Sequence, residues 1–240
     1  SHLEEVALEF KDVSVGPIKH FSLQLHKGET LAFGGLSDCG LRLIGRPGFG
    51  LERLEGGQVV RGGKVIDSPL KAIRSGIGYV SKNRDTEALI LSAPIGYNIA
   101  LPSYDGLSRF SFIDPVKENR MVANEAGKYA VKCKTVRQNV STLSGGNKQK
   151  VSFAKWTAKD SDVLIMDCPT RGVDIGVKQS MYALIAQMKR DGKAIILISE
   201  ELSELIGMAD KIMIMKDGEV TGEFMRSPDL QETDIIGSMI

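Results

Sequence analysis

The chain has 240 residues, of which 42% are hydrophobic and 25% charged, and its formal net charge is +1. This length and composition allow one sizeable core with a small appended lobe, whereas the near-neutral charge argues against a nucleic-acid binder. The three cysteines have no paired spacing and fit a reduced protein better than a disulfide framework or zinc site, and no apolar run approaches the roughly 20 residues that cross a bilayer.

Short strands recur along the chain and predict an α/β fold. The first two alternate apolar and polar residues, as half-buried strands do, and a turn at Lys27 and Gly28 precedes the third. The later strands are nearly continuous apolar runs, which are typical of a largely parallel sheet covered on both faces. The predicted strands comprise residues 6–10, 21–25, 30–33, 77–80, 163–166 and 194–198.

Helices are expected between these strands. The helix after the third strand contains several glycines and Pro47, and because proline inside a helix costs ~3 kcal/mol, we expect a short or frayed helix. Residues from about 92 to 139 are polar and helix-favouring and predict a helical insertion, and a helix is expected over residues 147–158. A later helix places its apolar residues on one face, namely Val177, Met181, Leu184, Ile185 and Met188.

The carboxyl end of the chain contains a predicted hairpin and a tail. Residues 212–220 form two strands around an Asp-Gly turn, and the sequence beyond Gly222 reads as a short tail. The predicted organisation is one domain over residues 4–225, with a helical subdomain inserted at about 92–150 and a tail over 226–240. Because the chain does not start with methionine, we expect it to be a fragment of a longer polypeptide.

Two glycine-rich segments have features of phosphate sites. Residues 35–42, with the sequence GLSDCGLR, lie between a predicted strand and a predicted helix, which is the frame of a P-loop. Residues 143–150, with the sequence LSGGNKQK, combine a hydroxyl and two glycines at a helix start, where backbone N–H groups and the helix dipole favour an anion. The first segment lacks the lysine and the hydroxyl of a working P-loop, whereas the second is intact.

These segments belong to an ordered set of motifs. Residues 143–150 are followed by 163–174 (VLIMDCPTRGVD), 199–204 (SEELSE) and 207–211 (GMADK). In this order and spacing, the chain resembles the ATP-binding cassettes of ABC transporters, and more narrowly the second, carboxy-terminal cassette of the double-cassette ATPases that energise bacterial monosaccharide importers. The resemblance implies a P-loop NTPase core with a mainly parallel buried sheet, an antiparallel β subdomain and a helical insertion.

The resemblance also assigns positions within the P-loop. Gly35 and Gly40 frame the loop that would approach the phosphates, Leu41 stands at the lysine position, and Arg42 stands at the Ser/Thr position. Arg42 has no oxygen for a metal but has donors for a phosphate, and Asp38 would repel phosphates. Two interpretations remain open: a strand-to-helix turn that once held phosphate, or weak, metal-free nucleotide binding.

Other catalytic positions of the family are also altered. Asp167 stands at the place of the magnesium-orienting carboxylate, but Cys168 replaces the glutamate that polarises water and Glu200 replaces the histidine that contacts the γ-phosphate. Lys82 stands where the family has Gln or Glu. A thiol accepts hydrogen bonds weakly, and Glu200 would repel a triphosphate. Cys168 is a poor candidate nucleophile because no histidine lies near it in the sequence. Since the glutamate and histidine positions are both altered, we expect no intact catalytic residue.

The segment over residues 143–150 corresponds to the signature motif of the family and keeps its pattern. By resemblance, Ser144, Gly145 and Gly146 face the γ-phosphate of ATP bound by the opposite cassette in a head-to-tail sandwich. Asp174 lies in the stretch 171–174, which corresponds to the loop that crosses this interface. The alternative is a Gly-rich helix cap that holds no ligand.

These features lead to the hypothesis of a cassette with a degenerate site that completes the ATP site of a partner. ATP and Mg²⁺ would be held mainly by an intact cassette, expected to precede this one in the same polypeptide, and the isolated chain would have little or no ATPase activity. Further partners would be transmembrane permease subunits and, indirectly, a substrate-binding protein, at the cytoplasmic face of the membrane.

Three alternatives stay open. One is a non-hydrolytic nucleotide-binding or scaffolding module that docks the permease, and another is an importer of nucleosides rather than sugars. A soluble ABC protein of translation or DNA repair would favour coiled-coil insertions or basic patches, neither of which is visible in the sequence.

Overall fold

The computed structural model describes residues 5–36, 40–109 and 112–239, which form two compact units. Unit 1 comprises Ser1–Tyr79, Asp162–Cys168 and Tyr182–Ile240, and unit 2 comprises Val80–Ser161 and Pro169–Met181. The predicted domain limits stay a prediction. Among the described residues, no helix is both long enough and apolar enough to cross a bilayer.

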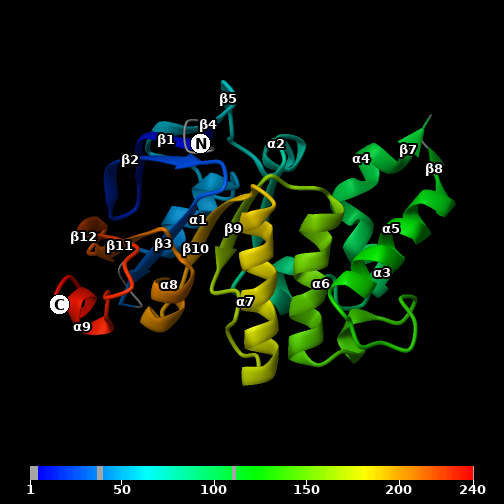
Figure 1. Cartoon of the computed structure of the whole chain (residues 1–240). Coiled ribbons are helices and arrows are strands. Elements are labelled where there is room, and N and C mark those ends of the chain that lie inside the picture. Colours follow the sequence, from blue (N-terminus) through cyan, green and yellow to red (C-terminus); the bar gives the residue numbers. More distant parts are fainter. Residues whose placement is uncertain (1–4, 37–39, 110–111, 240) are drawn as a thin grey trace. The chain divides into compact units, whose positions relative to one another are not determined.

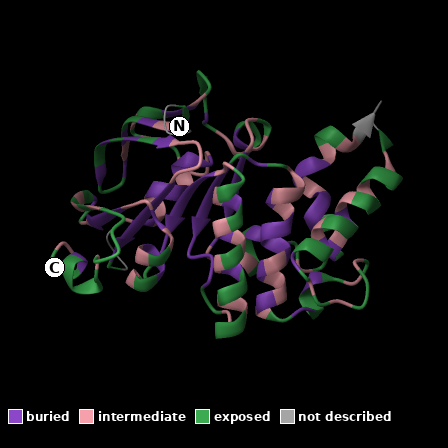
Figure 2. Cartoon of the chain, viewed as in Figure 1, coloured by how far each residue is buried: buried purple, intermediate pink, exposed green. Residues whose placement is uncertain are grey.

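Unit 1 is built on a six-stranded sheet (Figure 1). Its strands are β3 (Thr30–Gly35), β6 (Ile77–Val80), β9 (Val163–Asp167), β10 (Ala194–Ile198), β11 (Lys211–Lys216) and β12 (Glu219–Met225). The order is β12-β11-β3-β10-β9-β6, with parallel pairing from β11 to β9 and antiparallel pairing between β11 and β12. The strands β3, β9 and β10 are buried along their whole length (Figure 2), as their apolar sequences predict.

A four-stranded antiparallel sheet also belongs to unit 1. It contains β1 (Val6–Val15), β2 (Ile18–His26), β4 (Gly56–Arg61) and β5 (Lys64–Val65), in the order β2-β1-β4-β5. The first two strands are longer than the predicted 6–10 and 21–25, because they continue to a tight turn in which Gly16 has a φ of 55°. Together, the two sheets confirm the predicted combination of a mainly parallel core and an antiparallel subdomain.

Helix α1 (Arg42–Gly48), which follows β3, is as short as predicted and contains Pro47. Its glycines have a packing role that the sequence did not reveal. A Cβ atom on Gly45 would lie 2.8 Å from Cδ1 of Ile198, and one on Gly48 would lie 2.7 Å from Cδ1 of Ile165. Glycine therefore lets α1 lie directly against β9 and β10, at a cost of about 1 kcal/mol of helix propensity per residue.

The remaining helices of unit 1 are α2 (Pro69–Arg74), α8 (Leu202–Met208) and α9 (Glu232–Ile236). The hairpin of β11 and β12 confirms the prediction at residues 212–220, and β12 continues past Gly222 to Met225. The tail packs on this hairpin, because the hydroxyl of Thr221 donates to the carbonyl of Ser238 at 2.6 Å and Ile235 of α9 is buried.

Unit 2 is mainly helical. It contains a π-helical turn (Arg84–Ala88), α3 (Ile95–Ala100), α4 (Tyr104–Leu107), β7 (Ser108–Arg109), β8 (Phe112–Ile113), α5 (Pro115–Lys128) and α6 (Gly145–Ala158). The helix predicted over residues 147–158 is α6, which begins at Gly145, whereas the β7–β8 hairpin was not predicted. The carboxylate of Asp114 accepts hydrogen bonds from the first N–H groups of α5 and fixes the start of that helix.

Helix α7 (Ile175–Arg190) begins in unit 2 and ends in unit 1. Three members of its predicted apolar face, Met181, Ile185 and Met188, are buried. These side chains are part of the core, as the sequence analysis expected from their helical spacing.

Candidate functional site

The carboxyl ends of the parallel strands in unit 1 form the edge at which α/β proteins usually bind ligands. The backbone N–H of Cys168 donates to the carbonyl of Ile198 at 2.8 Å, and the N–H of Ser199 donates to the carbonyl of Phe33 at 3.1 Å. The strand ends of β9, β10 and β3 are thereby held side by side. This edge carries four of the predicted site residues, namely Gly35, Asp167, Cys168 and Glu200.

Asp167 is the buried carboxylate of this edge, with a side chain that is 1% exposed. Its Oδ2 accepts a hydrogen bond from the Tyr79 hydroxyl at 3.2 Å and lies 3.6 Å from Nε of Arg42. Burial, reinforced by the negative charge of Asp167, raises the pKa of Tyr79 above its usual range, so the phenol stays protonated and keeps donating. Asp167 is therefore engaged by a hydroxyl and a cation of its own chain.

The start of α1 differs from that of a working P-loop. Gly40 has a φ of 90°, a left-handed conformation that favours glycine. Leu41, at the expected lysine position, is only 6% exposed and so offers a buried apolar group instead of a charge. Arg42 is the first residue of α1, and its side chain is directed to Asp167. Asp38 lies outside the described residues.

Cys168 and Glu200 are the residues predicted at the glutamate and histidine positions of the family. Cys168 is buried and has a φ of 47°, which is unusual for a residue with a side chain. Glu200 is exposed in the turn after β10. This turn is ordered by Ser199, whose hydroxyl donates to the buried carboxylate of Glu204 and accepts from the N–H of Glu201 at 3.1 Å.

Among the described residues of this edge, those at the expected metal positions do not fit a magnesium ion. Neither Leu41 nor Arg42 carries a side-chain oxygen, and magnesium is held through oxygen ligands. The guanidinium of Arg42 also brings a permanent positive charge to 3.6 Å from Asp167, where it competes with a cation for the same carboxylate. Asp167, predicted at the metal position, therefore serves in this structure as an ion-pair partner.

In unit 2, Ser144 is the N-cap of α6. Its exposed hydroxyl accepts from the backbone N–H of Asn147 at 3.5 Å and from the side-chain amide of Asn147 at 3.0 Å. The amide oxygen of Asn147 accepts in turn from the N–H of Lys132 at 2.8 Å. Asn147 thus orients Ser144 at the positive end of a helix of 14 residues.

Two glycines follow this cap, and both are packed closely. A Cβ atom on Gly146 would lie 2.9 Å from Cγ2 of Val177 on α7, and one on Gly145 would lie 3.0 Å from Nη2 of Arg84. The absence of a side chain at Gly146 lets α7 approach the first turn of α6. Gly146 therefore requires glycine for packing, whereas a side chain at Gly145 would displace the guanidinium of Arg84.

The loop over residues 169–174 lies against the start of α6. The buried amide of Gln149 donates to the carbonyl of Pro169 at 2.6 Å, and the carbonyl of Gly172 lies 3.5 Å from the Cβ position of Gly145. At its end, the carboxylate of Asp174 accepts from the N–H of Val177 at 2.9 Å and caps α7. The structure thus brings the predicted residues Ser144, Gly145, Gly146 and Asp174 into one region of unit 2.

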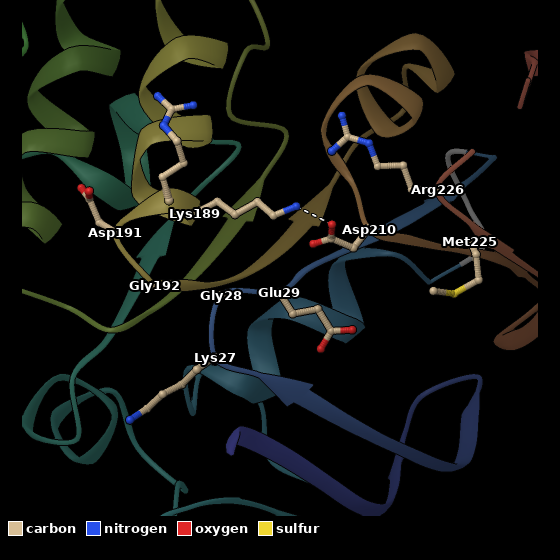
Figure 3. A pocket seen from close by; sticks show the side chains of 10 residues that line it. Lys27, Gly28, Glu29, Lys189, Asp191, Gly192, Asp210, Met225 and Arg226 are labelled. Atoms are coloured by element: carbon tan, nitrogen blue, oxygen red, sulfur yellow. Dashed lines mark hydrogen bonds and ion pairs between the residues drawn. The ribbon is translucent and has the colours of Figure 1, made fainter. Parts of the chain in front are cut away.

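A pocket of about 670 Å³ lies elsewhere in unit 1, by the amino ends of β3, β10 and β11 (Figure 3). Lys189 points across it to Asp210, with which it forms an ion pair, and Asp210 also accepts from the N–H of Thr30 at 2.9 Å. None of the predicted site residues lines this pocket. It lies at the amino ends of the strands and is distinct from the edge that carries Asp167.

Sequence reasoning missed two residues that organise these regions. Tyr79 was seen only as part of an apolar strand, although it contacts Asp167 across 88 positions of sequence. Arg84 received no role, although its guanidinium donates to the carbonyls of Arg171 and Gly172. A polar hydroxyl inside a buried strand was the available signal for Tyr79, whereas no local pattern marks Arg84.

Comparisons with known proteins agree with these observations. A family model described as ABC transporter matches residues 18–171. The putative ribose/galactose/methyl galactoside import ATP-binding protein 1 of Rhizobium meliloti is 38% identical over 93% of this chain and 45% of that protein. The ribose import ATP-binding protein RbsA of Bacillus cereus is 36% identical over 97% of this chain and 48% of that protein. The chain spans less than half the length of these curated relatives.

Solved structures support the fold. A dimeric ATP-binding cassette in a post-hydrolysis state, bound to ADP and Pi, matches with a TM-score of 0.79 and 20% identity over 92% of this chain and 99% of that chain. A nucleotide-free cassette from an ABC transporter matches with a TM-score of 0.79 and 15% identity over 98% of this chain and 94% of that chain. The predicted cassette fold, with its P-loop NTPase core and antiparallel subdomain, is confirmed.

Proposed function

Because the chain belongs to the ABC transporter family of ATP-binding cassettes, we propose that it completes the ATP site of a partner cassette and does not hydrolyse ATP in its own. Cassettes of this family bind ATP with Mg²⁺ in general. The observation that carries the proposal is the ion pair between Arg42 and Asp167, since it places a cation of the chain beside the carboxylate expected to orient the metal. Leu41 adds a buried apolar group at the lysine position.

The intact signature region supports the other half of the proposal. Ser144 presents an exposed hydroxyl at the start of α6, and Gly145 follows without a side chain. The first N–H groups of a helix have no partner within the helix and are suited to an anion. In the proposed pair, these groups stabilise the γ-phosphate of an ATP whose other contacts come from the P-loop of the partner.

The length of the relatives supports a proposal for the partner. The import ATP-binding proteins that this chain matches are about twice as long, so we infer that an intact cassette precedes this one in the same polypeptide. Their names point to ribose or galactose import, and we propose a related monosaccharide as the solute. Transmembrane permease subunits, at the cytoplasmic face of the membrane, and a substrate-binding protein complete the proposed transporter. Within this chain, residues 4–225 form the proposed cassette domain.

A substitution at Ser144 tests the proposal in the complete transporter. Ser144→Arg fills the space in front of the helix start and is expected to abolish ATP hydrolysis and solute uptake. Ser68→Arg is the matched control, because Ser68 caps α2 through the same contact, from the N–H of Lys71 at 3.5 Å, and lies away from the signature region in sequence. Unimpaired hydrolysis by the Ser144 variant contradicts the role of this chain at the partner's ATP.

A further inference from the structure

We propose that Arg84 is a positioning residue that holds the loop over residues 171–174 and the start of α6 in one rigid arrangement toward the partner's ATP. This inference rests on the proposed function and adds a residue that the resemblance did not assign. Arg84 lies in the π-helical turn Arg84–Ala88 of unit 2, and its guanidinium donates to the loop after β9.

The guanidinium of Arg84 bridges two segments that are far apart in the sequence. Its Nη1 donates to the carbonyl of Arg171 at 2.8 Å, and its Nη2 donates to the carbonyl of Gly172 at 3.2 Å. The same Nη2 lies 3.0 Å from the Cβ position of Gly145 and 3.4 Å from that of Gly172. Two glycines therefore leave room for one planar guanidinium, and only arginine presents paired donors in a fixed fork.

The turn that carries Arg84 is itself fastened along α6. Lys148 forms an ion pair with Asp85 at 3.2 Å, and its side chain is only 14% exposed. Two turns further along α6, Nζ of Lys155 donates to the carbonyl of Ala88 at 2.8 Å. The turn that carries Arg84 is thus held on α6 by Lys148 and Lys155. The guanidinium of Arg84 in turn holds the loop after β9.

The carbonyls of the loop fix the orientation of the Arg84 guanidinium, and this geometry supports a role in positioning the loop. Its Nε is buried and has no hydrogen-bond partner among the described residues, so the contacts to Arg171 and Gly172 set the orientation of the group. In the proposed pair, Ser144 and the loop both face the partner's ATP, and a misplacement of ~1 Å at such a site can cost about a hundredfold in rate.

The test uses the complete transporter with its two-cassette polypeptide. Arg84→Lys keeps the charge but loses the fork, and we expect the kcat of ATP hydrolysis to fall about tenfold or more. The KM for ATP should stay within about twofold, because the partner's P-loop supplies most of the binding. Arg137→Lys is the matched control, since Arg137 is an exposed arginine of unit 2 whose side chain forms no hydrogen bond or ion pair with the described residues, and it should leave both constants unchanged.

A second variant separates positioning from folding. In Arg84→Ala, added methylguanidine should restore part of the lost kcat, which a merely destabilised protein would not show. A kcat of Arg84→Lys within about twofold of wild type overturns the proposal, and so does a loss that methylguanidine does not reverse. If Ser144→Arg is inactive while Arg84→Lys is fully active, only the positioning role fails. If Ser144→Arg keeps full activity, the proposed function itself fails.

Discussion

Nε of Arg42 lies 3.6 Å from Oδ2 of the buried Asp167, at the edge where the parallel strands of unit 1 end. This ion pair joins the two residues that stand at the expected positions of the P-loop hydroxyl and of the magnesium-orienting carboxylate. The chain therefore places its own guanidinium where a magnesium ion would compete for Asp167.

Magnesium should have little effect on nucleotide binding by the isolated chain. We expect Mg²⁺ to change the Kd of a fluorescent ATP analogue by less than about threefold, because Arg42 already pairs with Asp167. The double variant Leu41→Lys/Arg42→Ser supplies a phosphate-binding cation and an oxygen ligand, and it should gain a dependence on Mg²⁺ of about tenfold or more. Arg53→Ser, at an exposed arginine of unit 1, is the control. A tenfold effect of Mg²⁺ on the wild-type chain would contradict the ion-pair account.

Turnover of ATP by the isolated chain should be negligible. Enzymes typically turn over at about 1 to 10³ s⁻¹, and a steady-state phosphate-release assay that found such a rate would refute the degenerate site. Cys168→Glu alone should not restore activity, because the new carboxylate would polarise water beside a loop that lacks the phosphate-binding lysine. Restored hydrolysis by this variant would show that the glutamate is the one group that the site lacks. Continued inactivity is expected if several positions of the site are altered.

Lys155 should make stability depend on pH. Burial lowers the pKa of this amine from 10.5 to about 8 in the folded chain. Between about pH 8 and pH 10.5 the unfolded chain binds more protons at this position, so stability rises with pH across this window, by on the order of 2 kcal/mol.

Lys155→Met lacks this titration. The free energy of unfolding from urea titrations should therefore rise in the wild type relative to the variant as the pH increases from 8 to 10.5. The variant also loses the hydrogen bond to the carbonyl of Ala88, but that loss is a nearly constant offset. Parallel stability curves over this window would show that the amine titrates in the folded chain as it does in water.

Gly146→Ala should destabilise unit 2, because the new methyl would lie 2.9 Å from Cγ2 of Val177. We expect a loss of about 1 to 3 kcal/mol in the free energy of unfolding, and Val177→Ala should reverse part of it in a double-mutant cycle. Gly127→Ala is the control, since it lies in α5 with open space around its Cβ position, and it should be neutral or stabilising by up to about 1 kcal/mol. Additive effects of the two substitutions would show that the side chains do not compete for the same space.

Local patterns in the sequence predict the strands of the core well. The apolar runs at 77–80 and 194–198 coincide with β6 and β10, because a strand covered on both faces needs a continuous apolar sequence. The proposed alteration of the P-loop also rests on neighbouring residues, since Leu41 and Arg42 stand where the resemblance places the lysine and the hydroxyl. These features depend on neighbouring residues, which the sequence shows directly.

Contacts between distant segments could not be predicted in this way. The helix-breaking glycines of α1 are explained by the close approach of Ile165 and Ile198, which are more than a hundred residues away. The hydrogen bond from Tyr79 to Asp167 and those from Arg84 to the loop after β9 likewise appear only when the chain is folded. Such contacts leave no periodic signal, because each residue is selected by a partner elsewhere in the chain.

The ion pair between Arg42 and Asp167 also has a consequence for stoichiometry. Two equivalent cassettes would consume two ATP molecules each time the pair closes and reopens. In the proposed transporter only one of the two sites has a complete set of catalytic groups, so each cycle consumes one ATP. The proposed coupling ratio of the importer, measured as ATP hydrolysed per solute molecule delivered, then depends on the side chains that keep this site from hydrolysing ATP, and the guanidinium of Arg42 is one of them.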